Sequence, residues 1–100
     1  MWIDNIHNLK RGDFAFFIEV TMLCNGHVRM EAKPHPEYSV TGGNPVLHGP
    51  VGEINNRRKL ACGMVEVIDV NTYGDRIEVR QLKSREAKAQ ASMMGYEGIK

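Results

Sequence analysis

The sequence predicts a mainly β (α+β) fold: a twisted antiparallel sheet or small open barrel of about five strands, with a short N-terminal segment and a C-terminal helix. Two apolar-patterned runs between Phe14 and Lys33 meet at Asn25-Gly26, which indicates a β-hairpin. A second pair of such runs lies between residues 60 and 82, and helix-forming residues follow Ser84. The 100 residues suit one domain spanning 1–100.

The first residues predict a short helix or turn that covers one end of the core. Trp2, Ile3, Ile6 and Leu9 recur at a spacing close to helical. The segment from residue 10 to residue 13 then has the composition of a tight turn that leads into the first long strand.

The hairpin between residues 14 and 33 carries an internal conflict of register. An Asn-Gly pair favours a two-residue type I′ turn, which would pair Leu23 with Val28 and Met22 with Arg29. That pairing places Met22 beside a charged residue, although its strand has a continuous apolar face. We therefore expect a bulge or a longer loop. The expected apolar face consists of Phe14, Phe16, Ile18, Val20 and Met22.

The second half of the chain predicts a long loop, a second hairpin and a helix. Residues 41–53 hold four glycines and two prolines, which favours an irregular segment with a functional role. Strands are expected over 60–70 and 76–82, and a helix capped by Ser84 and stopped by Gly95. Its narrow stripe of Ala87, Ala91 and Met94 favours docking on another copy, so we expect a homo-oligomer. The last residues, 96–100, are expected to fray.

Composition and charge restrict the classes of function only loosely. Hydrophobic content of 42% and a net charge of +1 are globular values that indicate neither nucleic acid nor membrane as partner. Cys24 and Cys62 lie in apolar runs, which favours buried, reduced thiols and a cytoplasmic location. No secretory leader pattern and no stretch of membrane-spanning length is present in the sequence.

The strongest candidate site combines the glycine-rich loop with the basic residues after it. Glycines let backbone N–H groups approach an anion, and Arg and Lys donate charge-assisted hydrogen bonds to phosphate or carboxylate. No Walker or dinucleotide-binding pattern is present. The candidate ligand-binding residues are Gly42, Gly43, Asn44, His48, Gly49, Asn56, Arg57, Arg58 and Lys59.

Other sequence features favour catalysis or metal binding less. The four histidines show no metal-ligand spacing, so we expect no metal and no cofactor. His35 and His48 are the two histidines whose context is restricted, and a small histidine-dependent enzyme is the third hypothesis. No nucleophile elbow is present, so we expect a protein that is not an enzyme.

The sequence therefore predicts a non-catalytic binding module for a small anionic, nucleotide-like ligand. An accessory protein of a phage or mobile element that sequesters a signal molecule is one setting for such a module. The alternative is a small barrel that binds nucleic acid or protein and inhibits or scaffolds that partner. It would use the polar face of the first hairpin, together with the basic residues near the C-terminus.

Overall fold

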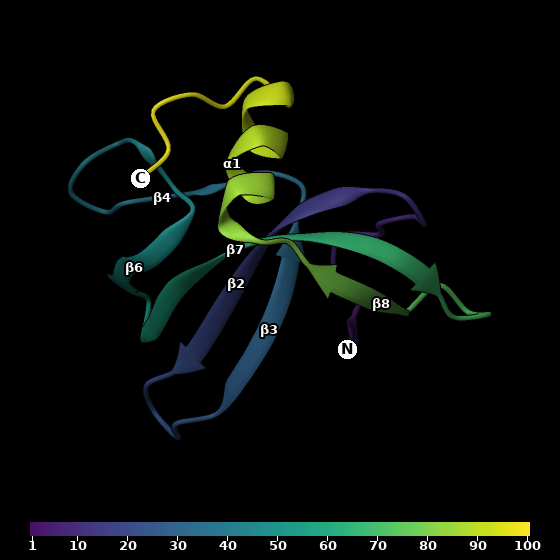
Figure 1. Ribbon diagram of the computed structural model, residues 1–100. Coiled ribbons are helices and arrows are strands. Elements are labelled where there is room, and N and C mark those ends of the chain that lie inside the picture. Colours follow the sequence, from purple (N-terminus) through teal and green to yellow (C-terminus); the bar gives the residue numbers. More distant parts are fainter.

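The computed structural model describes all residues 1–100 as an open antiparallel sheet with one C-terminal helix, and the sheet does not close into a barrel (Figure 1). This confirms the predicted fold class. No helix has the length and apolarity that crossing a membrane requires. The elements are β1 (Trp2–Asp4), β2 (Phe14–Met22), β3 (Val28–Lys33), β4 (Glu37–Tyr38), β5 (Pro45–Val46), β6 (His48–Ile54), β7 (Arg57–Val70), β8 (Arg76–Gln81) and α1 (Ser84–Met93).

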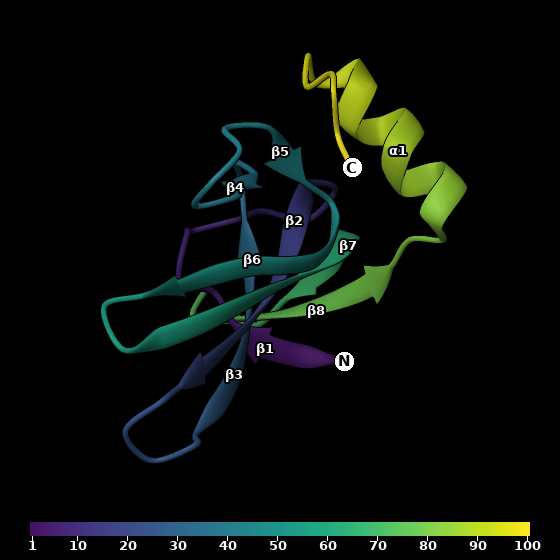
Figure 2. The same cartoon turned by 90° about the vertical axis from the view of Figure 1, so that its left-hand side faces the viewer.

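Strand β7 connects the two halves of the sheet. One of its edges pairs with β2 from Arg57 to Glu66. The other edge pairs with β6 up to Cys62 and with β8 from Val65 onward. Strand β3 then lies on the outer edge of β2, and β1 on the outer edge of β8 (Figure 2). The short pair β4–β5 forms a separate sheet.

A β-bulge at Gly63 lets β7 pass from one half of the sheet to the other. Phe16 pairs with Met64 and Ile18 with Ala61, so two β7 residues lie opposite one β2 residue. Gly63 has φ of +92°, a region that L side chains rarely adopt, and its N–H donates to the Leu47 carbonyl over 2.7 Å. The bulge explains why apolar side chains on both faces of β7 are buried.

Three clusters of buried side chains cover the faces of the sheet. The largest lies on the face of Ala15 and Phe17, with residues of β1, β3, β7 and β8. The second lies under α1 on the opposite face, around Phe16 and Met64. The third, around Ile18 and Val20, is covered by β5 and β6. The two faces of β2 are therefore both buried, and neither alone is the core face.

Helix α1 packs on its own sheet. Ala87 and Ala91 are fully buried in the cluster that contains Phe16 and Met64, and small residues there allow close approach. The packing therefore accounts for the alanine stripe within one copy of the chain. Oligomerisation stays a prediction. The expected cap is wrong, because the N-cap is Lys83 and makes no side-chain hydrogen bond, although the helix does begin at Ser84.

The tail after α1 is held against the sheet, so the expected fraying is wrong. Gly95, with φ of +91°, ends the helix in a Schellman arrangement in which the Tyr96 N–H donates to the Ala91 carbonyl over 3.0 Å. The Tyr96 ring then meets Phe16 edge to face at 5.4 Å. Its hydroxyl lies 2.8 Å from His35 Nδ1.

Two further expectations, for residues 2–4 and for residues 41–53, are also corrected. Residues 2–4 form strand β1, paired with β8 through Ile3 and Ile77, where a helix or turn was expected. The 41–53 segment is not one loop, because β5 and most of β6 lie within it. Its irregular part ends at Asn44.

The positions of the hairpin turns differ from the simplest prediction. Thr21 pairs with Val28, so residues 23–26 form a longer loop, as the register conflict indicated. The two-residue turn with positive φ is instead Asn55-Asn56, at 52° and 59°, between β6 and β7. The loop of the β2–β3 hairpin lies beside the turn of the β6–β7 hairpin, because the Leu23 N–H donates to the Asn56 carbonyl over 2.9 Å.

The prediction for the cysteines is half wrong. Cys24 is exposed, because it lies in the longer loop rather than in a strand. Cys62 is half-buried beside the bulge, and burial raises the pKa of its thiol. Both thiols are free.

Candidate functional site

The predicted anion-binding residues are spread along the β6–β7 hairpin and the β4–β5 connection. Gly42, Gly43 and Asn44 lie in that connection, and Asn56 lies in the turn at the far end of the hairpin. His48 and Gly49 begin β6, whereas Arg57, Arg58 and Lys59 begin β7. Because His48 pairs with Cys62 and Ile54 with Arg57, the two ends of β6 are about 20 Å apart. The structure brings Asn56 close to Arg57 but does not bring His48 to either of them.

Carboxylates already pair with two of the three basic residues. Lys59 Nζ lies 3.0 Å from Glu37 Oε1, which Lys33 also contacts. Burial raises the pKa of Glu37, but the hydrogen bonds and charges of Lys33 and Lys59 outweigh that effect and lower it. Arg58 lies 2.9 Å from the exposed Glu53. Of the three basic residues, only Arg57 forms no ion pair.

The two restricted histidines contact hydroxyl groups. His48 Nε2 lies 3.4 Å from Ser84 Oγ, and both residues are exposed. His35 contacts Tyr96, which fastens the tail. No group of three or more His, Cys, Asp and Glu side chains is placed to hold a metal ion.

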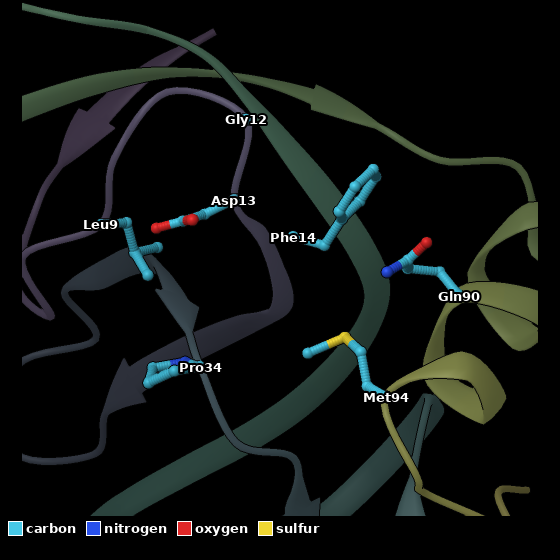
Figure 3. Close-up of a pocket in the computed structure, with 7 residues that line it drawn as sticks. All are labelled: Leu9, Gly12, Asp13, Phe14, Pro34, Gln90 and Met94. Atoms are coloured by element: carbon cyan, nitrogen blue, oxygen red, sulfur yellow. The ribbon is translucent and has the colours of Figure 1, made fainter.

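A surface hollow that the sequence did not indicate lies between α1 and the start of β2 (Figure 3). It is open to solvent and has a volume of about 410 Å³, within the range of small-molecule sites. We call it the helix hollow. Its lining residues are Leu9, Gly12, Asp13, Phe14, Pro34, Gln90 and Met94.

One wall of the helix hollow is a tight turn fixed to the sheet. The Asp13 N–H donates to the Lys10 carbonyl over 3.0 Å, and Gly12 has φ of +92°, as a type II turn requires. Asp13 Oδ2 accepts the Lys10 N–H over 2.8 Å. Two backbone hydrogen bonds of 2.8 Å, from Gly12 to Val67 and from Val67 to Asp13, attach the turn to β7. The carboxylate position is therefore defined before any ligand arrives.

The other wall is the inward edge of α1. Figure 3 shows Gln90 and Met94 on the helix facing Phe14 and Pro34, with Asp13 beside Leu9. The buried Ala87 and Ala91 hold the helix on the sheet. The walls are thus mostly apolar, and the side chains of Asp13 and Gln90 add a carboxylate and an amide. This combination suits a compact organic molecule with a few polar groups.

A second, smaller hollow of about 260 Å³ lies where β1 approaches the outer edge of β3. Trp2 is 41% exposed there, beside Met1 and the half-buried Met30. Two ion pairs flank it, Arg76 with Asp4 at 3.3 Å and Arg29 with Glu31 at 2.9 Å. We call this region the Trp2 surface.

Comparisons of the chain with protein-family models, with curated proteins and with solved structures found no match.

Sequence patterns could not have located the helix hollow. Its residues come from separate segments near positions 9–14, 34 and 90–94, and no local spacing relates them. The one available signal was the turn composition of residues 10–13, which marked a well-defined loop before β2.

Proposed function

We propose that the chain is a non-catalytic binding module that holds a small organic molecule in the helix hollow. The single observation that carries the proposal is a hollow of ligand size in which a fixed carboxylate and an amide face mostly apolar walls. The site is built on a turn bonded to β7 and on a helix packed on the sheet, so it requires no assembly from mobile segments.

The chain is still a non-catalytic binding module, as the sequence predicted, but its ligand binds in the helix hollow and not at residues 42–59. An anion there would have to displace Glu37 from Lys59 and Glu53 from Arg58. The residues predicted to bind that anion also lie too far apart for all of them to contact one small molecule, since His48 and Arg57 are at opposite ends of the β6–β7 hairpin. A role as a phage or mobile-element accessory protein that sequesters a signal molecule stays compatible with a ligand in the helix hollow.

A blocking substitution tests the proposal. Gln90→Trp places an indole at the mouth of the hollow, whereas Ala89→Trp places the same ring on the exposed side of α1. With naphthylmethanol as a neutral probe, saturation-transfer NMR should report binding to the wild type and to Ala89→Trp, and weaker binding to Gln90→Trp. Equal binding by all three proteins would refute the hollow as the site. Circular dichroism checks that both variants stay folded.

Self-association through the Trp2 surface is a second candidate function. Trp, Met and Arg are typical of protein interfaces, and Trp2 and Met1 are 41% and 64% exposed. The two ion pairs supply both signs of charge at the rim, so two copies related by a two-fold axis can match each other. The expected homo-oligomer would then form through this surface instead of through α1.

A further inference from the structure

We infer that the ligand of the helix hollow is an organic cation, with an amine or amidine on an apolar body, and that Asp13 selects it. This inference rests on the function proposed above. Asp13 is the only charged residue among the seven that line the hollow. An ionised carboxylate there favours a cation and repels a carboxylate or phosphate of a ligand.

The geometry of Asp13 leaves it free to accept a hydrogen bond from a ligand. Its Oδ2 accepts the Lys10 N–H, and its Oδ1 takes part in no hydrogen bond within the chain. Because the turn is fixed by Gly12 and Val67, the carboxylate does not have to be ordered on binding. An amine entering the hollow can therefore reach an acceptor that is already in position.

The remaining lining residues suit the apolar part of such a ligand. Leu9 and Pro34 lie on one side of the hollow, Met94 lies across from them on α1, and the Phe14 ring lies near Gln90 (Figure 3). The ring of Phe14 is half-buried, and an aromatic face attracts cations. Gln90 makes no side-chain hydrogen bond within the chain, so its amide is free to bond to a polar group on the part of the ligand that lies beside α1.

Three probes that share one ring system separate charge from shape. They are naphthylmethylamine, naphthylmethanol and naphthoate, and their affinities follow from shifts in ¹H–¹⁵N correlation spectra of the uniformly labelled chain. We expect naphthylmethylamine to bind about fivefold more tightly than naphthylmethanol, the gain that an exposed ion pair provides. Naphthoate should bind more weakly than naphthylmethanol.

Asp13→Asn removes the charge and keeps an oxygen that can accept the Lys10 N–H. In this variant we expect naphthylmethylamine to lose its advantage of about fivefold, while naphthylmethanol binds as before. Glu53→Gln is the control with the same change of net charge. Glu53 in β6 lies opposite Arg58 in β7, and Arg58 lies opposite Thr21 in β2. Thr21 is about 23 Å along β2 from Phe14, so Glu53 lies far from the helix hollow.

The outcomes separate this inference from the proposed function. Binding of all three probes to the hollow with equal affinity, unchanged by Asp13→Asn, would refute the role of Asp13 and leave the hollow as a ligand site. An equal loss in Glu53→Gln would also refute it, because the effect would then be one of net charge. Failure of every probe to shift residues of the hollow would refute the proposed function itself.

Discussion

The conformation of Gly63 predicts a specific loss of stability in Gly63→Ala. An alanine at φ of +92° costs about 1–2 kcal/mol through contact of its Cβ with the backbone. That Cβ would also lie 3.0 Å from Cε1 of His48, so the exposed imidazole must turn away, at about 0.5 kcal/mol. We expect a total near 2 kcal/mol and a melting temperature lower by roughly 8–16 °C.

Gly74→Ala provides the matched control for this prediction. Gly74 has φ of +76° in the turn between β7 and β8, and its Cβ would meet no atom within 4 Å. Urea denaturation followed by circular dichroism should show a smaller loss for Gly74→Ala than for Gly63→Ala. Adding His48→Ala to Gly63→Ala should recover about 0.5 kcal/mol, the part caused by the imidazole. A Gly63→Ala loss no greater than that of Gly74→Ala would refute the reasoning about the bulge in β7.

Two further predictions concern Glu37 and the Trp2 surface. Glu37→Gln should lower the free energy of unfolding at pH 7 by about 1–2 kcal/mol, because it leaves Lys33 and Lys59 without their shared carboxylate. Since the pKa of Glu37 is lowered in the folded state, this stabilisation exists above the ordinary glutamate pKa and is lost as pH falls through the lowered value. Urea titrations from neutral to acidic pH should therefore show the difference from the wild type shrinking, and a constant difference would contradict the assignment. Sedimentation velocity should show self-association of the wild type that Trp2→Ala weakens, and a monomer at millimolar concentration would exclude the Trp2 surface as a self-association site.

The strongly periodic segments were predictable from the sequence. The strands β2, β3, β7 and β8 each contain an apolar or alternating run, and α1 follows from its helix-forming residues and from Gly95. The conflict between Met22 and Arg29 correctly indicated a loop longer than Asn25-Gly26 alone. Local pattern was sufficient there because side-chain alternation dictates which register buries apolar residues.

The elements that depend on distant partners were not predictable. Strand β1 has three residues and is stabilised by β8, which lies more than seventy positions later in the chain. Strand β6 contains Gly49, Pro50 and Gly52, which signal a loop, although an edge strand with a bulge tolerates them. For α1, the small residues indicated a close packing partner, but the sequence could not show that the partner is the chain's own sheet.

The candidate site illustrates the same limit more strongly. Glycines and basic residues near one another in sequence predicted an anion site, yet β6 separates His48 from Arg57 by its full length. The register also places Arg58 opposite Glu53, so the neutralising charge comes from the neighbouring strand. The helix hollow, in contrast, joins the turn before β2 to α1 and exists only in the folded chain.

The most direct test of the proposed function is a titration of the ¹⁵N-labelled chain with naphthylmethylamine, followed by its ¹H–¹⁵N correlation spectrum. The account predicts saturable shifts concentrated at the amides of Gly12, Asp13, Phe14 and Gln90, with the turn Asn55-Asn56 unaffected. Absence of saturable shifts, or shifts concentrated at residues 42–59 instead, would contradict the helix hollow as the binding site.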